Sequence, residues 1–189
     1  MSDTLIDDGK GRGYKAEVSK NNRLLTRASN TIQMATISEE EGEAYIFASG
    51  DFVNITTTDT ETGMFHIKNT SSTKHLHIYS IRSCADQINL WKLYKNSTGG
   101  TLLSNQTEGS KNNLSLISNN VPDTTVYKGS DSVTLSGGTM LEHWINNVGH
   151  STEVFEGSLI LGKNDSIELT VELATAGKVC CRVIGYYED

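Results

Sequence analysis

The chain has 189 residues, of which 36% are hydrophobic and 21% charged, and its net charge is −7 at pH 7. This size and composition fit one globular domain with a short extension and exclude a wholly disordered chain. No apolar run approaches the roughly 20 residues that span a membrane, and the first residues contain no apolar core of a leader peptide. We therefore expect no membrane partner and no secretory signal.

Residues 1–27 differ in charge from the rest of the chain. They hold six Lys/Arg and four Asp/Glu, a balance of +2, whereas residues 28–189 hold ten and nineteen, a balance of −9. The first segment contains three glycines and shows neither a helical nor a strand period. We expect residues 1–27 to form an extended basic N-terminal arm and residues 28–189 to form a β-sandwich domain. The acidity of that domain argues against a nucleic-acid partner.

From residue 43 onward, apolar and polar residues alternate with a period of two, and β-branched and aromatic residues are frequent. This pattern predicts strands, whereas residues 28–42 are ambiguous between a strand and a helical turn. The expected strands are 44–48, 52–57, 64–67, 75–81, 88–93, 114–117, 141–145, 154–161, 167–173 and 179–187.

Eight to ten short strands in about 150 residues predict an all-β fold with two antiparallel sheets. The long polar loops expected at 96–112 and 118–131 favour Greek-key crossovers over tight hairpins. A jelly-roll-like β-sandwich is therefore the leading architecture. An immunoglobulin-like sandwich is the second, because the sequence has no Cys…Trp…Cys pattern.

The most tempting catalytic feature is the pair His75 and His77, which would share one face of a strand with Tyr79 and Ile81. Two such histidines can bind a metal in cupin-like jelly rolls, but no carboxylate follows them at the required spacing. We interpret them as partly exposed strand residues and expect no metal. The glycine pairs at 99–100 and 137–138 are interpreted as turns that no helix follows.

Three cysteines, Cys84, Cys180 and Cys181, do not form a disulfide framework by their spacing. Adjacent residues on a strand point to opposite faces, so Cys180 and Cys181 are poor partners for each other. We expect all three to be reduced thiols, one of them filling core space. Without a catalytic motif in the sequence, we predict no enzyme activity and no cofactor.

Several short phrases resemble a family of tailed-bacteriophage virion proteins. They are 96–105 (NSTGGTLLSN), 126–129 (VYKG), 135–139 (LSGGT), the terminal 183–188 (VIGYYE) and, in the arm, 23–27 (RLLTR). The resemblance implies a jelly-roll capsid decoration (cement) protein, a homotrimer made in the host cytoplasm and located on the capsid surface of the virion. It implies the major capsid protein as partner and offers no catalytic residues.

Under this hypothesis the arm reaches a neighbouring protein through apolar anchors and through arginines that pair with carboxylates. The expected capsid or oligomer contacts are Arg12, Tyr14, Lys15, Arg23, Leu24, Leu25 and Arg27.

Two other functions stay open. The alternative is a virion-associated carbohydrate-binding or host-adhesion module of the neck, tail or head fibre. Its exposed aromatic residues would be Tyr79, Trp91, Tyr127 and Trp144. The third is an enzyme, either a cupin-like metalloprotein or a glycosidase.

Overall fold

The computed structural model describes residues 6–7, 15–16, 37–38, 41–105 and 107–188. Its contacts divide the chain into two units, residues 1–32 and 33–189. In the first unit, β1 (Ile6–Asp7) and β2 (Lys15–Ala16) pair antiparallel. Strands of two residues are too short to produce a period in the sequence. The predicted boundary between residues 27 and 28 lies outside the described residues.

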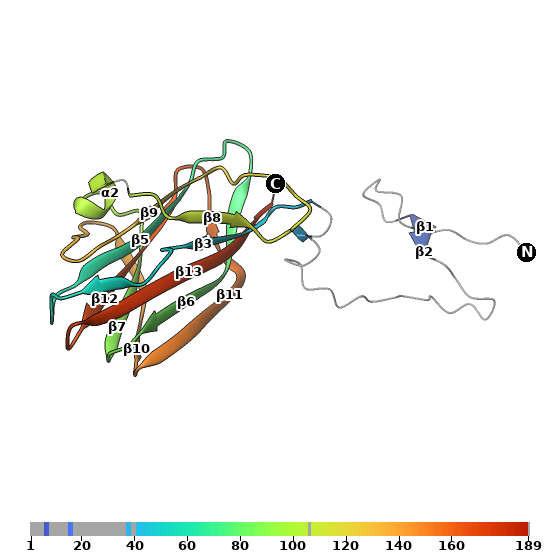
Figure 1. The fold of residues 1–189 in the computed structure, drawn as a ribbon. Helices are drawn as coiled ribbons and strands as arrows, with labels where there is room; N and C mark the ends of the chain where they lie inside the picture. Colours follow the sequence, from blue (N-terminus) through green and yellow to red (C-terminus); the bar gives the residue numbers. More distant parts are fainter. Residues whose placement is uncertain (1–5, 8–14, 17–36, 39–40, 106, 189) are drawn as a thin grey trace, which may run out of the picture. The chain divides into compact units, whose positions relative to one another are not determined.

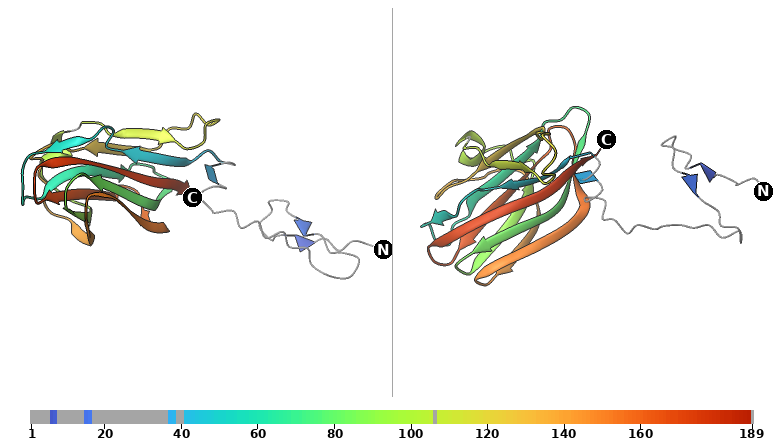
Figure 2. Two further views of the ribbon diagram at one scale, coloured as in Figure 1. Left: turned by 60° about the horizontal axis from the view of Figure 1, so that its bottom comes forward. Right: turned by 45° about the vertical axis from the view of Figure 1, so that its right-hand side comes forward.

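Two antiparallel sheets pack face to face in the second unit (Figures 1 and 2). One sheet has the order β10-β7-β12-β5-β9, and the other has the order β11-β6-β13-β3-β8, with β4 also pairing to β13. The strands are β3 (Ala44–Ala48), β4 (Val53–Ile55), β5 (Thr62–Asn69), β6 (His75–Ala85), β7 (Asn89–Lys95), β8 (Ser110–Asn113), β9 (Thr124–Lys128), β10 (Thr139–Asn146), β11 (Gly149–Leu161), β12 (Ser166–Leu173) and β13 (Gly177–Glu188).

The strand pairing is nested, which is the topology of a jelly roll. The short strands β4, β8 and β9 can be set aside. Among the strands that remain, the first, β3, pairs with the last, β13, and the second, β5, pairs with the last but one, β12. Inside these lie the pairs β6 with β11 and β7 with β10. The predicted all-β, jelly-roll-like antiparallel sandwich is therefore confirmed.

The core lies between the sheets and comes from the residues that alternate inward along the strands. Trp91, Phe47, Phe65 and Ile78 are each at most 1% exposed. Burying an aliphatic or aromatic side chain of this size stabilises the fold by about 1.5–3 kcal/mol. The carbohydrate-binding hypothesis required an exposed Trp91, but Trp91 lies two residues before Leu93 on β7, and both side chains point into the core.

The alternation of inward-facing and outward-facing side chains is interrupted within strand β6. Its pairing with β13 is shifted where Ile184 faces Ser80 and Gly185 faces Ile78, which leaves Tyr79 as an extra residue. A bulge of this kind exchanges the faces of the residues that follow it. The prediction that Ile81 shares a face with His75 and His77 is therefore wrong, since Ile81 is fully buried in the core.

The connection between β7 and β10 contains β8, β9 and the short helix α2 (Thr101–Asn105) in place of structureless loops. The strand predicted at 114–117 is wrong: these residues form a loop, with Leu116 fully exposed. The expectation that no helix follows Gly99 and Gly100 is also wrong, because α2 begins at the next residue. Gly100 has a φ of 101°, and a Cβ there would lie 2.5 Å from the carbonyl oxygen of Thr134.

No helix within the described ranges is long and apolar enough to cross a membrane.

Candidate functional site

Two arginines lie directly opposite each other on the outer face of the sheet that contains β13. Arg182 on β13 is the cross-strand partner of Arg82 on β6, and both side chains are exposed. Neither forms an ion pair with any residue that the structure describes. Because like charges at opposite positions destabilise a sheet, this pair costs the isolated chain stability.

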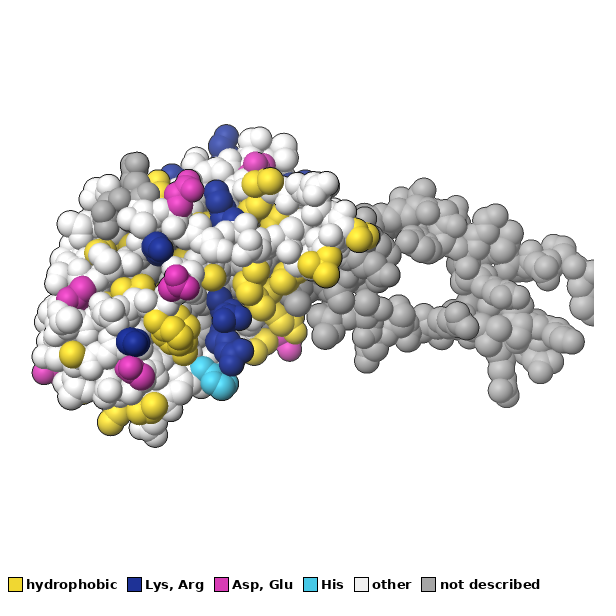
Figure 3. Space-filling view, viewed as in Figure 1, with side chains coloured by type: hydrophobic (Ala, Val, Ile, Leu, Met, Phe, Trp, Pro, Cys, Tyr) yellow, Lys and Arg dark blue, Asp and Glu magenta, His cyan; other side chains and the backbone are white. Residues whose placement is uncertain are grey.

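Apolar residues border the arginines on one side. Ile184 on β13 pairs with Ile46 on β3, and Val154 on the far strand β11 is 57% exposed in the same row. Figure 3, which views this face, shows Lys and Arg side chains with apolar side chains gathered beside them. Ile46, Ile184 and Val154 therefore form an apolar surface beside the two arginines.

A groove of about 430 Å³ lies on the other side of the arginines, where the loops before β4 and β11 meet the ends of β6 and β13. Phe52 and Val148 line it and are 63% and 67% exposed. Asp86, an acidic residue in its wall, accepts a hydrogen bond of 2.7 Å from the backbone N–H of Lys178. Asp86 forms no ion pair with either arginine in the described part of the chain.

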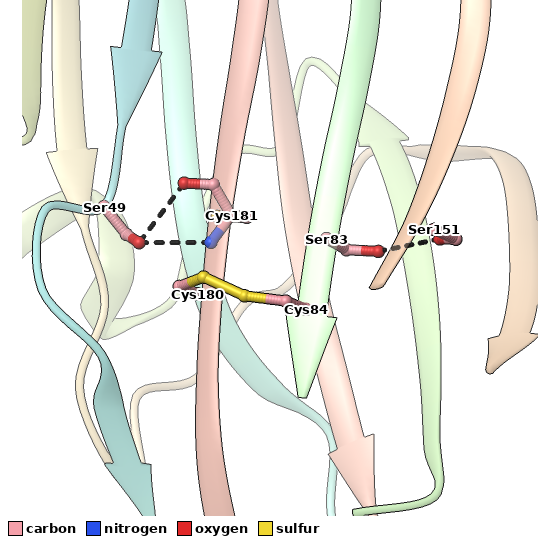
Figure 4. The surroundings of a disulfide bond; sticks show 6 residues. All are labelled: Ser49, Ser83, Cys84, Ser151, Cys180 and Cys181. Carbon is pink, nitrogen blue, oxygen red and sulfur yellow. Dashed lines mark hydrogen bonds between the residues drawn. A yellow bond between two sulfur atoms is a disulfide. The ribbon is translucent and has the colours of Figure 1, made fainter. Parts of the chain in front are cut away.

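A disulfide between Cys84 and Cys180 forms part of the groove wall (Figure 4). The prediction of three reduced thiols is therefore wrong. The two residues are separated by 96 positions but face each other across β6 and β13, with Cα atoms 5.2 Å apart, within the range that a disulfide requires. The sequence does not show this register, so the pairing was missed.

Cys181 points the other way and is a buried free cysteine, as the alternation of adjacent strand residues predicts. Burial raises the pKa of its thiol to about 12, although a hydrogen bond from Ser49 acts in the opposite direction. Ser49 also bonds the backbone N–H and carbonyl of Cys181, at 3.2 and 3.3 Å. The neutral thiol fills core space and is a poor nucleophile.

The outer face of the other sheet contains a buried carboxylate. Glu168 on β12 has no solvent exposure and faces His66 on β5. Its Oε1 accepts hydrogen bonds from His66 Nδ1 at 2.9 Å and from Ser166 Oγ at 2.5 Å, and its Oε2 accepts one from the N–H of Ser97 at 3.1 Å. The Ser166 hydroxyl and the N–H of Ser97 are fixed donors to the group, and an ionised carboxylate takes its remaining hydrogen bond from a proton on Nδ1 of His66.

This Ser–Glu–His set does not have the geometry of a nucleophilic triad. In a triad the hydroxyl donates to the imidazole, which in turn donates to the carboxylate. Here Ser166 and His66 both donate to Glu168, so the hydroxyl has no base. The carboxylate therefore fixes the orientation of the imidazole ring.

The histidine pair predicted on β6 divides between two environments. His75 is exposed, whereas His77 stacks on Tyr186 with ring centroids 5.1 Å apart and bonds the carbonyl of Gly157 through Nδ1 at 3.0 Å. Among the described residues, no three His, Cys, Asp or Glu side chains gather so that they could hold a metal ion.

Of the four aromatic residues proposed for sugar stacking, the structure buries one and packs another against the core. Trp91 is fully buried, and Trp144 packs on the core cluster and donates from Nε1 to Ser83 at 3.1 Å. Tyr79 and Tyr127 are partly exposed. Trp144 is partly exposed as well, so of the four residues only Trp91 is fully removed from a ligand's reach.

The residues predicted to contact the capsid or an oligomer partner belong to the arm. Lys15 lies in β2, but its side chain is not described. The others lie outside the described residues, and their predicted roles stay predictions: Arg12, Tyr14, Arg23, Leu24, Leu25 and Arg27.

Comparisons with known proteins give no identity. No family model matches the chain, and neither the curated proteins nor the solved structures contain a significant match. Function is therefore argued from the chain's own surfaces.

Proposed function

We propose that the chain is a non-enzymatic structural protein of a phage virion that decorates the capsid shell, with the outer face of the β13 sheet as an attachment surface. The observation that carries the proposal is the exposed pair Arg82–Arg182, which has no carboxylate partner among the described residues. The phage-like sequence phrases add the virion as the setting, and the major capsid protein as the partner.

The chemistry of the surface specifies the kind of partner it suits. A guanidinium binds a carboxylate through two parallel hydrogen bonds, and arginine is frequent in the centres of protein interfaces. Apolar groups beside the charges, such as Ile46, Ile184 and Phe52, exclude water from such contacts and strengthen them. The partner surface should therefore carry carboxylates surrounded by apolar side chains.

The arm provides a second contact in this proposal. Ordering an extended segment costs about 1–2 kcal/mol per residue, so residues 1–27 need many contacts to stay bound. Self-association as a homotrimer remains part of the proposal, and light scattering of the purified chain measures its stoichiometry.

The alternative, a carbohydrate-binding or host-adhesion module, loses one of the four aromatic residues on which it was based, and a second is partly covered. Trp91 is in the core, and Trp144 packs on the core with its Nε1 bonded to Ser83. Attachment to a protein surface is therefore the better-supported primary function.

The test compares particles from producing cells that contain the wild-type chain or the variants Arg182→Glu and Lys95→Glu. Lys95 is an exposed cation of β7 in the other sheet, so its reversal makes the same charge change away from the proposed surface. We expect the wild type and Lys95→Glu to sediment with purified shells, and the shells to be labelled by antibody to the chain. We expect Arg182→Glu to bind about tenfold less, the effect of losing roughly 1.4 kcal/mol.

Absence of the chain from purified particles would overturn the virion proposal. Equal binding of folded Arg182→Glu and wild type would remove the arginine surface from it. A chain lacking residues 1–27 tests the arm: normal binding would exclude the arm as a required contact.

A further inference from the structure

A polar pocket of about 470 Å³ opens on the other sheet, where the segment around Asn96 and the turn at 163–165 approach strands β5 and β9. Its lining includes Lys68, Lys163 and Tyr127. The pocket lies above the buried Glu168–His66 pair, because His66 is itself a lining residue. Its volume is in the range that ligand-binding pockets commonly have.

The pocket contains two lysines, Lys68 and Lys163, that form no ion pair with a described residue. Lys74 and Lys92, by contrast, are both paired with glutamates. The one carboxylate among the described lining residues, Asp165, accepts hydrogen bonds from the Gly162 N–H and from Asn96 Nδ2, each 3.1 Å long. The buried Glu168 beneath the pocket is likewise engaged, with His66, Ser166 and the N–H of Ser97, so the two lysines are the charged groups that remain for an anionic ligand.

The remaining lining groups suit a ligand that carries hydroxyls. Thr70 and Thr125 contribute hydroxyls and Asn164 contributes an amide, and none of these side chains is engaged in a hydrogen bond with a described residue. Tyr127 contributes an aromatic ring, which stacks on the ring of His66 with centroids 5.4 Å apart and planes 16° apart. A ring held in this way is a rigid apolar surface for the C–H face of a sugar.

The contact between Glu168 and His66 sets the orientation of the imidazole ring beside the pocket. Glu168 fixes the proton on Nδ1 of His66, and Nε2 makes no hydrogen bond with a described residue. Nε2 is therefore an oriented hydrogen-bonding group on a residue that lines the pocket. In the same wall the buried hydroxyl of Ser97 has no hydrogen-bond partner within the described part of the chain.

Phosphate fits the pocket less well. Phosphate sites commonly use arginine or the backbone N–H groups at a helix N-terminus. The pocket has no arginine among its described lining residues, and the nearby helix α2 has only five residues. A carboxylate on a hydroxylated ring matches all the groups present.

We propose that this pocket binds a sugar acid, a hexuronate residue of an acidic glycan, whose carboxylate is held by Lys68 and Lys163 and whose ring lies against Tyr127. Its hydroxyls bond Asn164, the two threonines and Nε2 of His66. The site is separate from the arginine surface, so its success or failure does not depend on the attachment function.

Calorimetric titration of the full chain tests the site with three probes: a galacturonate oligosaccharide, the matching neutral galactose oligosaccharide and glucose 6-phosphate. The variants are Lys68→Gln/Lys163→Gln and, as a control, Arg82→Gln/Arg182→Gln, which removes two exposed cations from the other sheet. We expect the uronate to bind the wild type and the control equally. The lysine double variant should bind about tenfold or more weakly, while its circular dichroism spectrum stays that of the wild type.

Four results would overturn the proposal: no uronate binding at millimolar concentration, equal binding of the neutral oligosaccharide, tighter binding of the phosphate, or loss of binding in the arginine control. A second variant, Tyr127→Ala, separates the ring contact from the charges. It should weaken uronate binding without making it insensitive to salt, and unchanged binding would contradict the ring contact.

Discussion

The central strands of the two sheets are each tied to a neighbour on the outer face, but by different chemistry. β13 is joined to β6 by the disulfide Cys180–Cys84, and β12 is joined to β5 by the hydrogen-bonded pair Glu168–His66. Both pairs join residues that lie directly opposite in the register. One pair is covalent and partly exposed, whereas the other is polar and buried.

The charges around the two pairs differ in the same way. On the β12 face, Lys92 lies 2.7 Å from Glu61 and 3.6 Å from Glu172, and Thr170 donates to Glu61 at 2.7 Å. On the β13 face the two arginines have no such partners among the described residues. The cluster around Lys92 satisfies its charges within the chain, whereas Arg82 and Arg182 form no ion pair with a described residue, so the comparison supports the arginine pair as the attachment surface.

Removing the disulfide should have the largest effect on stability. For a loop of about 100 residues, the chain-entropy model gives about 4.7 kcal/mol, and measured values for disulfides are typically about 2–4 kcal/mol. We expect the variant Cys84→Ser/Cys180→Ser to lose about 4 kcal/mol in urea unfolding. Reductant should lower the wild type to the same stability and leave the variant unchanged; a wild type that does not respond to reductant would contradict this.

Breaking the polar tie of the other sheet should cost slightly less. Glu168→Ala leaves His66, Ser166 and the N–H of Ser97 without their acceptor, and we expect a loss of about 3 kcal/mol in the same measurement. Glu172→Ala, on the same strand but one-third exposed, is the matched control and should lose less than about 1 kcal/mol. Equal losses of stability in the two variants would contradict a larger contribution from the buried Glu168–His66 pair.

The paired charges of the β12 face should show a smaller, pH-dependent effect. Burial by itself raises the pKa of Glu61, but hydrogen bonds from Lys92, Thr170 and Tyr94 outweigh it and hold the pKa below its usual value of 4.5. The group therefore contributes stability above about pH 4.5, which is lost as the pH falls through the folded-state pKa.

Urea unfolding of Glu61→Gln should show a deficit of about 0.5–1 kcal/mol at pH 7 that shrinks as the solution is acidified. Glu142→Gln, which removes the carboxylate of an exposed residue of β10 in the same sheet, is the control. A Glu61→Gln deficit that stays constant from pH 7 to pH 3 would contradict the ion-pair interpretation.

The smallest effect should have the opposite sign. Arg182→Gln removes one of two like charges at opposite positions, and we expect the free chain to gain about 0.3 kcal/mol at low salt, with the gain disappearing at 1 M salt. Lys95→Gln should be neutral in both conditions. A salt-independent loss in Arg182→Gln would mean that the arginine already has a partner within the chain.

Most of the fold was predictable because inward and outward residues alternate along the strands. The predicted runs at 44–48, 88–93 and 167–173 keep that pattern, and the strands β3, β7 and β12 form there. The pattern failed where local geometry changes without a change in composition. The bulge at Tyr79 moves Ile81 into the core, and the apolar residues 114–117 lie in a loop.

The sites were less predictable because each depends on register. Arg82 and Arg182 are 100 positions apart in the sequence, and no local feature indicates that they are neighbours. Glu168 and His66 are separated by 102 positions and look like ordinary outward-facing residues of their strands. Only the nested pairing brings these residues together. The prediction that the arm contacts the capsid remains untested.

The nested pairing also determines when the body can be completed during synthesis. β13 lies between β6 and β3 but comes after all the other described strands in the chain, so both neighbours keep an open edge until it inserts. Unpaired strand edges promote aggregation, and pairing between distant segments folds slowly. A nascent chain stalled before residue 177 should therefore bind chaperones. A chain that ends before residue 177 should also be completed by a separate peptide of residues 177–188, which would insert between β6 and β3.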